Sequence, residues 1–384
     1  MLLLKNAKLY GKTAVDILIA GNQVEAIGNL HTETFRADDS ADSTRPDFLE
    51  VRELDGATVI PALIDQHVHV TGGGGEGGMT TRCPELQVSD IIEAGVGTLV
   101  GLLGTDALTR SVENLLAKTI ALKEYGFYAH CLTGAYEIPS PTITGSVMKD
   151  IAFLSECIGL KVAISDHRCS HPTYEDLVKL AGEVRLGGLI GKKAGVMHLH
   201  VGSGKQGISQ IFEIIERENI PSALFRPTHM NNRHDEAMKL AKLGSYPDFT
   251  TGTDHRKTAQ TVIRAMEEAP EGHITMSSDS NGSMPKWNEK REMVGIGIGK
   301  MSTLYGTVKS MVEDFGMDLE KALAPCTVNV AKSLGMYPYV GTLEAGSRAD
   351  ILVLDDNLDI RDFILAGRDV MKNKERLLKI NFVD

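Results

Sequence analysis

Two histidines separated by one residue, His67 and His69, follow an apolar run near the start of the chain. The run, Val59–Ile64, contains a proline and leads directly into Asp65. Because alternate residues of a strand face the same side, both imidazoles are expected to project together from the carboxyl end of a strand. Two imidazoles on one face suit a first-row divalent ion such as Zn2+. The spacing therefore predicts a metal site.

Further groups that can hold or bridge metal ions lie beside other apolar runs. They are Lys161 in the sequence Gly-Leu-Lys, the pair His198 and His200, His229 after Pro-Thr, and Asp279 after Ser-Ser. Each alone has an ordinary explanation: a histidine satisfied in the core, a solvated lysine at a strand end, or an aspartate that caps a helix. Because four histidines, one lysine and one aspartate occur together at the ends of five runs, we interpret this set as one metal centre.

The apolar runs themselves predict the fold. They recur roughly every 25 to 40 residues, and helix-like segments such as Leu108–Tyr125 and Ile208–Glu218 separate them. The eight runs are Val59–Ile64, Thr98–Leu103, Phe127–Leu132, Leu160–Ile164, Gly195–Leu199, Ser222–Phe225, Asp248–Thr251 and Ile274–Ser277. Strand–helix alternation at this spacing predicts an α/β fold, a (β/α)8 TIM-like barrel, and active sites of such barrels lie at the carboxyl ends of the strands.

Both ends of the chain have the pattern of short strands instead. Leu2–Leu4 and Val15–Ile19 alternate or cluster apolar residues, and Gly21-Asn22 marks a turn after them. The polar stretch 31–48 is predicted to be a loop. A turn-rich segment at 341–346 leads into the strand-like sequence Asp-Ile-Leu-Val-Leu at 350–354. We expect residues 1–58 and 340–384 to form one small β-sandwich domain, and 59–339 to form the barrel.

Composition narrows the classes of function. The 384 residues are 42% hydrophobic and 24% charged, which is ordinary for a globular protein. A net charge of -11 argues against binding to nucleic acid or acidic membranes, although a small anionic substrate stays possible near local arginines. Five scattered cysteines without a CxxC pair, an apolar start of only three leucines and the lack of a long apolar stretch predict a cytoplasmic protein without a membrane span.

This set of residues resembles the binuclear subtype of the amidohydrolase superfamily, over nearly the whole chain. The resemblance rests on HxH after the first strand, lysine at the fourth, histidines at the fifth and sixth, and aspartate at the eighth, together with Gly-Thr-Leu-Glu-Ala-Gly-Ser-Arg-Ala-Asp at 341–350. It implies that Lys161 is carboxylated by CO2 to N6-carboxylysine and bridges two divalent ions. By the same resemblance one ion is held by His67, His69 and Asp279, and the other by His200 and His229.

The chemistry of such a centre is amide hydrolysis. A carbamate on Lys161 supplies two anionic oxygens, whereas an ammonium beside two dications would be strongly repelled. Two ions share a hydroxide because metal binding lowers the pKa of water, to about 7 on a single catalytic zinc. Asp279 can accept its proton and deliver it to the leaving amine. Zn2+ is the expected ion, but these ligands also accept Co2+ or Mn2+.

Five further stretches resemble the isoaspartyl dipeptidases, which cleave a peptide bond made through the aspartate β-carboxyl. They are residues 71–78, 101–106, 134–137, 164–168 and 279–283. Such a dipeptide carries one ammonium and two carboxylates. Glu76, on a glycine-rich loop without the Gly-Lys-Ser/Thr of a phosphate loop, is the expected partner of the ammonium. Arg168 is the expected clamp for a carboxylate, because guanidinium binds carboxylates in a bidentate manner.

Four more residues complete the predicted pocket. Tyr136 is expected to stabilise the developing oxyanion, Ser283 to hydrogen-bond the substrate, and Thr105 to line the pocket. Arg233 is the second expected carboxylate clamp. It stands one residue farther from His229 than the family pattern places it, so either the loop bulges or Asn231 and Asn232 take over part of its role.

Two other functions stay open from the sequence. A cyclic-amide hydrolase, such as a dihydroorotase or hydantoinase, would use the same metal ions, although Glu76 with Arg168 favours a zwitterionic substrate. A non-catalytic scaffold of the same fold should have lost ligands, whereas all six are present. The family resemblance further implies a homo-oligomer, with an octamer as one expectation.

Overall fold

Eight parallel strands form a barrel in the computed structural model, which describes residues 1–30, 49–288 and 293–379. The predicted loop at 31–48 lies outside the described residues. The barrel strands are β6 (Leu63–Val68), β7 (Val96–Gly101), β8 (Tyr128–Gly134), β9 (Cys157–Ile164), β10 (Val196–Val201), β11 (Phe225–Thr228), β12 (Asp248–Thr250) and β13 (Thr275–Ser277). The predicted (β/α)8 barrel is thereby confirmed.

Hydrogen bonds and packing close the barrel into a ring. Strands β6 to β11 pair in sequence order, and β12 pairs with β13. Between these two groups, β11 packs beside β12 and β13 beside β6. A parallel bridge between Val68 and Ser280 joins the first strand to the segment after the last. All eight carboxyl ends therefore meet at one mouth, where site residues can converge.

Two of the predicted runs were placed wrongly. Val59–Ile64 is split, because Thr58–Pro61 (β5) pairs with strands from both chain ends, and the barrel strand β6 begins only at Leu63. Ser222–Leu224 is a 3-10 helix, and the strand that follows is Phe225–Thr228. Short apolar runs have the same composition in strands and in buried helical turns, so periodicity cannot separate them.

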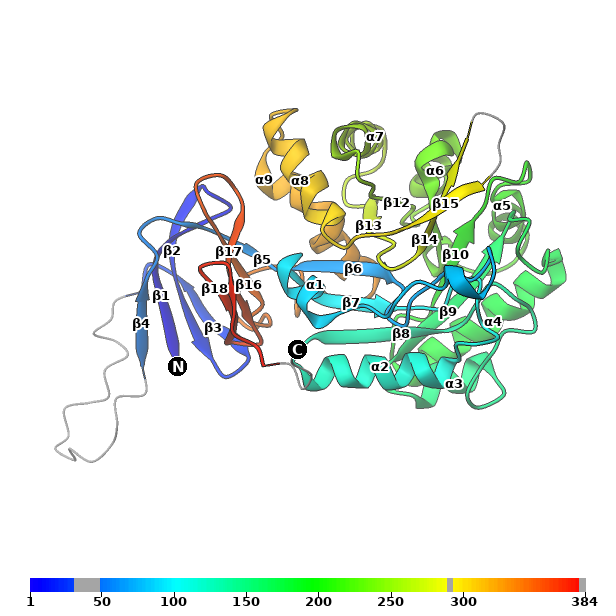
Figure 1. Cartoon of the computed structure of the whole chain (residues 1–384), viewed down its shortest axis with the longest axis horizontal. Helices are drawn as coiled ribbons and strands as arrows, with labels where there is room; N and C mark the ends of the chain where they lie inside the picture. The colour runs from blue at the N-terminus through cyan, green and yellow to red at the C-terminus, as the bar shows by residue number, and fades with distance from the viewer. Residues whose placement is uncertain (31–48, 289–292, 380–384) are drawn as a thin grey trace.

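Helices cover the outside of the barrel (Figure 1). They are α1 (Val88–Glu93), α2 (Val112–Glu124), α3 (Val147–Phe153), α4 (Tyr174–Gly191), α5 (Ser209–Arg217), α6 (His234–Lys242), α7 (His255–Glu268), α8 (Thr303–Glu313), α9 (Leu319–Leu323) and α10 (Val328–Ser333). Helix α4 begins with a capping box, in which Thr173 and Asp176 each accept the other's backbone N–H. It buries Leu177, Leu180 and Val184 at the spacing of one helical face.

The two chain ends combine in a second sheet beside the barrel (Figure 1). Its strands are β1 (Leu2–Leu9), β2 (Thr13–Ala20), β3 (Gln23–Gly28), β4 (Glu50–Glu53), β5 (Thr58–Pro61), β16 (Ile351–Leu354), β17 (Ile360–Leu365), β18 (Arg368–Lys372) and β19 (Glu375–Arg376). Instead of the two sheets of a sandwich, all nine are hydrogen-bonded into one continuous sheet. Alternate residues such as Leu2, Leu4, Ile17 and Ile351 share its apolar core.

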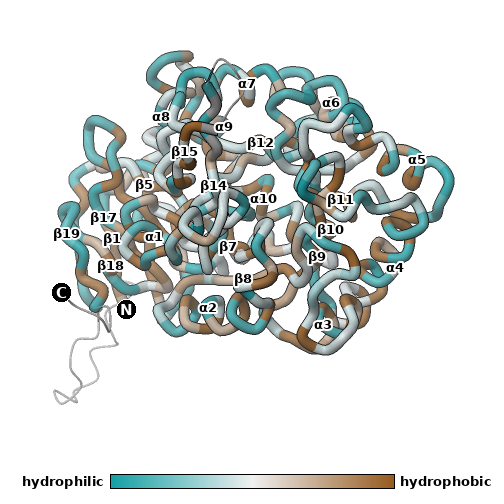
Figure 2. Tube along the Cα trace, turned by 45° about the vertical axis from the view of Figure 1, so that its right-hand side comes forward, coloured by the Kyte–Doolittle hydropathy of each residue, from teal (hydrophilic) through white to brown (hydrophobic). Residues whose placement is uncertain are grey.

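The surface and an additional hairpin complete the architecture. Outer segments around α6 and β19 are hydrophilic in Figure 2. No helix within the described ranges has the length and apolar character that a membrane span requires.

A hairpin of β14 (Ser283–Trp287) and β15 (Met293–Ile298) follows the last barrel strand. Its first residue, Ser283, is one of the predicted substrate-binding residues.

A buried ion pair ties the terminal sheet to the barrel. Arg348 Nε lies 2.7 Å from Asp350 Oδ2, and both side chains are buried. The guanidinium also donates to the carbonyl of Gly126, just before β8. Asp350 Oδ1 accepts the backbone N–H of Ala366 at 2.7 Å. Burial raises the pKa of Asp350 to about 6, so the carboxylate depends on its arginine partner to stay charged at neutral pH.

We expect Arg348→Met to lower the free energy of unfolding by about 3 kcal/mol, because it leaves Asp350 buried without a counterion. Urea denaturation followed by circular dichroism measures the change. The control is Arg217→Ala, which removes an exposed pair with Glu213 and should leave the midpoint unchanged. Equal midpoints for both variants would contradict a structural role for the buried pair.

Candidate active site

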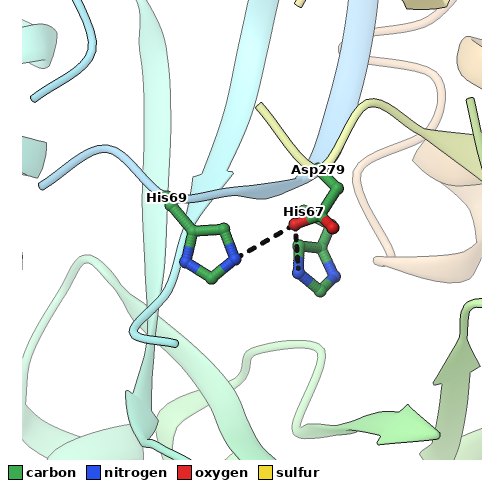
Figure 3. A group of neighbouring side chains, drawn as sticks. All are labelled: His67, His69 and Asp279. Atoms are coloured by element: carbon green, nitrogen blue, oxygen red, sulfur yellow. Dashed lines mark ion pairs between the residues drawn. The ribbon is translucent and has the colours of Figure 1, made fainter. Parts of the chain in front are cut away.

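The centre of the site is a carboxylate between two imidazoles. His67 lies in β6, His69 directly after it, and Asp279 two residues after β13. Asp279 Oδ1 is 3.3 Å from His67 Nε2 and 3.1 Å from His69 Nε2 (Figure 3). The three side chains are buried or nearly so. One predicted ligand set is therefore brought together from opposite ends of the barrel sequence.

A buried aspartate holds the two segments that carry this group. Asp65 Oδ1 accepts the backbone N–H of His67 at 3.3 Å and that of Ser278 at 3.2 Å. Its other oxygen accepts the Ser278 hydroxyl. Because Ser278 precedes Asp279, one carboxyl group fixes β6 and the end of β13 at the same height. Burial raises the pKa of Asp65 to about 7.

The backbone packs so closely around His69 and Asp279 that two neighbouring positions must be glycine. Asp279 has a φ of 55°, in the left-handed region that most residues avoid. A Cβ atom at Gly282 would lie 2.5 Å from Asp279 Oδ1, and one at Gly104 would lie 3.0 Å from His69 Cε1. Only glycine fits at these positions without displacing His69 or Asp279.

Lys161 points into the barrel from the middle of β9 and is fully buried. The predicted run, Leu160–Ile164, began one residue before Lys161, but the strand begins at Cys157, four residues before it. Its Nζ atom lies 3.4 Å from His67 Nε2. Burial lowers the pKa of Lys161 to about 7. The lysine is thus adjacent to the predicted ligands and is much easier to neutralise than a surface lysine.

The neighbouring histidines of β10 have different surroundings. His198 Nε2 lies 2.8 Å from His67 Nδ1, so His198 orients His67 and leaves His67 Nε2 toward Asp279. His200 Nε2 lies 2.8 Å from Asp166 Oδ2, and its Nδ1 lies 2.6 Å from the Tyr136 hydroxyl. Burial lowers the pKa of His200 to about 4. A neutral His200 therefore donates to Asp166 and accepts from Tyr136.

His229 reaches the centre from the end of β11. It has a φ of 66° and precedes a short 3-10 helix, Met230–Asn232 (η4). Its ring centroid is 4.6 Å from that of His200 and 5.2 Å from that of His67. His229 Nδ1 lies 2.6 Å from the Thr250 hydroxyl, which fixes the ring. The two histidines predicted for a second ion are thus neighbours, although both nitrogens of His200 already have partners.

The donor set fits a divalent cation. Among the described residues, His67, His69 and Asp279 offer ligand atoms within 4.8 Å of one another. Asp279 Oδ1 and His69 Nδ1 are buried without a partner of hydrogen-bonding geometry, which is costly unless another group satisfies them. Burial lowers the pKa of His67 to about 3, so this imidazole is in the neutral form that binds metal. Two imidazoles and a carboxylate are suitable ligands for zinc.

A cavity of about 960 Å³ opens above this centre. His69, His200, His229 and Asp279 line it, whereas the buried His67 and Lys161 are not among its lining residues. All six residues predicted for substrate binding also line it: Glu76, Thr105, Tyr136, Arg168, Arg233 and Ser283. The structure therefore brings four of the six predicted metal ligands and all six predicted substrate-binding residues to one cavity.

Glu76 is the meeting point of the predicted pocket. Its Oε1 atom accepts the Ser283 hydroxyl and lies 3.2 Å from Arg168 Nη1. Its Oε2 atom lies 3.4 Å from the Thr105 hydroxyl. Four residues from four separate stretches of the chain are thereby connected at the mouth of the cavity.

The loop that carries Glu76 is a defined structure. Gly72 and Gly74 have φ values of 81° and 79°. A Cβ atom at Gly72 would lie 2.2 Å from the carbonyl oxygen of Cys83, and one at Gly74 would lie 2.4 Å from that of Thr81. The glycines are required because the backbone of 81–83 packs directly against them. This packing sets the position of the Glu76 carboxylate.

Asp166 is a site residue that the sequence reasoning missed. It accepts Arg168 Nε at 2.9 Å and Nη2 at 2.8 Å, in addition to its contact with His200. Burial alone would raise the pKa of Asp166, but hydrogen bonds from Arg168 and His200 hold it well below its usual range. Its position two residues before Arg168 was the available signal, since a carboxylate so placed can orient a guanidinium.

Arg233 and the two asparagines before it have different surroundings in the structure. Residues Met230–Asn232 form the 3-10 helix η4 directly after His229, and both Asn232 and Arg233 line the cavity. Asn231 is turned away and bonds to the backbone of Thr250, at 2.9 and 3.0 Å. Arg233 Nη2 donates to the carbonyl of Gly202 at 2.8 Å. Of the two asparagines, only Asn232 is therefore available to the cavity.

The chain is similar to a known protein family and to a solved structure. Residues 249–377 match the model of the Amidohydrolase family. The crystal structure of a beta-aspartyl dipeptidase from Fervidobacterium islandicum AW-1, in complex with beta-Asp-Leu dipeptide, is 36% identical, covers 100% of both chains and superposes with a TM-score of 0.90.

More distant relatives share the fold. L-hydantoinase from Paenarthrobacter aurescens is 23% identical over 94% of this chain and 86% of its own. A dihydropyrimidinase structure from Brevibacillus agri NCHU1002 is 16% identical, with a TM-score of 0.64 over 98% of this chain and 96% of that one. The full-length identity above 30% and the family match together show that the chain is a hydrolase. It belongs to the beta-aspartyl (isoaspartyl) dipeptidase family of the amidohydrolase superfamily.

Proposed function

We propose that this chain hydrolyses β-aspartyl dipeptides at the cavity described above and releases aspartate and a second amino acid. The observation that carries the proposal is the placement of Glu76 and Arg168 side by side at the mouth of a cavity that His69, His200, His229 and Asp279 also line. The full-length similarity to a beta-aspartyl dipeptidase that binds beta-Asp-Leu supports it.

The charges that line the cavity match those of the substrate. A β-aspartyl dipeptide has one α-ammonium and two carboxylates near the scissile amide. Glu76 provides the anion for the ammonium, and Arg168 and Arg233 provide cations for the carboxylates. In the structure, Glu76 and Arg168 neutralise each other. An incoming ammonium that takes the place of Arg168 on Glu76 releases Nη1 of that arginine for a substrate carboxylate.

Divalent ions supply the reactive chemistry in this proposal. His67, His69 and Asp279 would hold one ion, His200 and His229 the other, and Lys161 would bridge them as a carbamate. Bound there, such ions acidify water and polarise the amide carbonyl. Formation of the carbamate joins the lysine nitrogen to the carbon of CO2 and releases one proton. Zn2+ is our first choice of ion for this nitrogen and oxygen ligand set.

The remaining steps belong to side chains of this chain. The Tyr136 hydroxyl donates a hydrogen bond to the carbonyl oxygen as negative charge develops there. Asp279 accepts the proton of the attacking water and passes it to the departing nitrogen as the C–N bond breaks. Asp166 keeps both His200 and Arg168 in position. One water is consumed, and its oxygen ends in the new aspartate carboxylate.

A cyclic-amide substrate remains the alternative that the sequence left open. L-hydantoinase and dihydropyrimidinase are similar to this chain at 23% and 16% identity, which reflects the common fold. A hydantoin or pyrimidine ring has no ammonium to neutralise Glu76. The charged pairs at the cavity mouth therefore favour the zwitterionic dipeptide. Cytoplasmic location and assembly into a homo-oligomer also stay predictions.

We expect the purified enzyme to cleave isoAsp-Leu at least tenfold faster than α-linked Asp-Leu, since only the β-linked isomer places both free α-groups beside the scissile bond. Amino-acid release measured by chromatography gives kcat/KM for each dipeptide. Dihydroorotate and hydantoin serve as comparison substrates. Preferred cleavage of the α-linked isomer or of a cyclic amide would overturn the substrate assignment.

We expect Glu76→Gln to reduce kcat/KM for isoAsp-Leu by about 10- to 100-fold, because a hydrogen bond to a charged group contributes about 1.5–3 kcal/mol. The effect should fall away for a substrate analogue whose ammonium is acetylated. Glu85→Gln is the matched control, since Glu85 is an exposed glutamate outside the cavity. Equal kcat/KM values for the two variants would argue against the ammonium role of Glu76.

We expect Lys161→Met to lower the bound metal from two ions per chain to one or none, because it removes the bridging group and keeps a side chain of similar length. Elemental analysis of the purified protein measures the content. Thermal unfolding should show that the variant is folded. Lys205→Met, a change in a lysine of the cavity wall, is the control. Full metal content in Lys161→Met would contradict the bridge.

A further inference from the structure

A second cavity, of about 620 Å³, lies at the opposite end of the barrel. Its walls include Tyr128 and Ile158 near the beginnings of β8 and β9, Gly195 directly before β10, and Arg226 near the beginning of β11. Residues 332–336, at the end of α10, complete it. None of its lining residues lines the active-site cavity, so it is a separate site on the amino-terminal face.

This cavity has a strongly one-sided charge. Five basic side chains line it, and none of its lining residues is an aspartate or glutamate; the five are Arg185, Lys192, Lys193, Arg226 and Lys332. The whole chain, by contrast, carries a net charge of -11. A concentration of positive charge in a concave wall attracts anions, because nearby low-dielectric protein focuses the field.

Arg226 is the deepest of these cations, and only 3% of its surface is exposed. Its Nη atoms donate to backbone carbonyls, including that of Ser333 at 2.6 Å, whereas its Nε atom is buried without a partner. Burial lowers the pKa of Arg226 to about 10, so the group is still charged at neutral pH. No carboxylate pairs with it among the described residues, and a buried guanidinium without a counterion is costly.

Other lining groups are also ready to donate. Both ring nitrogens of His130 are buried without a hydrogen-bond partner. Lys193 Nζ donates to the carbonyls of Ile151 at 2.7 Å and Cys157 at 3.1 Å, and it forms no ion pair with the described residues. The side chains of Arg185 and Lys192 are exposed at the rim and form no ion pair with the described residues.

We propose that this cavity binds a small oxyanion with two or more negative charges, of the phosphate or polycarboxylate class. The deep guanidinium and the imidazole of His130 receive the anion from inside, and Arg185, Lys192 and Lys332 neutralise it at the rim. Tyr128 and Tyr246 add aromatic walls that suit an organic part of the ligand. The proposal is independent of the reaction at the other end of the barrel.

Isothermal titration calorimetry of the full chain with pyrophosphate, and separately with citrate, tests the proposal. We expect saturable binding that weakens as NaCl is raised from about 0.05 to about 0.3 M, because salt screens exposed charges. Lys192→Gln should raise Kd by up to about fivefold, the usual limit for one exposed charge, and Arg185→Gln with Lys192→Gln by about tenfold or more. A stronger response to pyrophosphate or to citrate identifies which oxyanion class is preferred.

Matched variants separate this site from the metal centre, which also binds chelating anions. The double variant keeps every active-site residue, so heat from that centre persists in it and only the signal of the second cavity is lost. Lys257→Gln, which removes an exposed lysine outside both cavities, should bind like the parent. Absence of saturable binding, or equal Kd values for the parent and the double variant, would overturn the proposal.

Discussion

The carboxylate of Asp279 between His67 and His69 is the contact on which the site depends. It joins the first and last strands of the barrel, and it is held there by a second aspartate, Asp65, which bonds to the backbone on both sides. Only a closed barrel brings these two segments together, since 211 intervening residues, 68–278, separate His67 from Asp279. The ring of parallel strands is therefore a requirement of the chemistry as well as of the packing.

A chain of charged and polar contacts extends from this centre to the cavity mouth. His200 bonds to Asp166, Asp166 to Arg168, and Arg168 to Glu76. Each link is partly or fully buried, where hydrogen bonds between charged groups are strong and unpaired groups are costly. A group that binds at Glu76 thus changes the surroundings of His200, a predicted metal ligand, through Arg168 and Asp166. The residues predicted to bind substrate and those predicted to bind metal are therefore parts of one network.

Much of this arrangement could be predicted from the sequence, because residues that can bind metal recur at the ends of the apolar runs. Histidines at i and i+2, and polar residues directly after apolar runs, indicate the mouth of a barrel without any knowledge of pairing. The predictions that failed concern segments whose structure depends on partners distant in the sequence. The run Val59–Ile64 divides between two sheets because β5 pairs with the distant strand β16. The height of Lys161 followed from where β9 begins, and Ser222–Leu224 is a helical turn of strand-like composition.

The same limit explains why Asp166 and His198 were not assigned functions. Each acts through a neighbour: Asp166 orients Arg168 and His200, and His198 orients His67. A residue that binds a ligand must be of a particular type, but a residue that orients another needs only the right position in space. The position of such a residue in space is set by the register between strands. His198 of β10, for example, pairs with Lys161 of β9. Residue type can therefore suggest the ligands, whereas the folded barrel is needed to show what holds them.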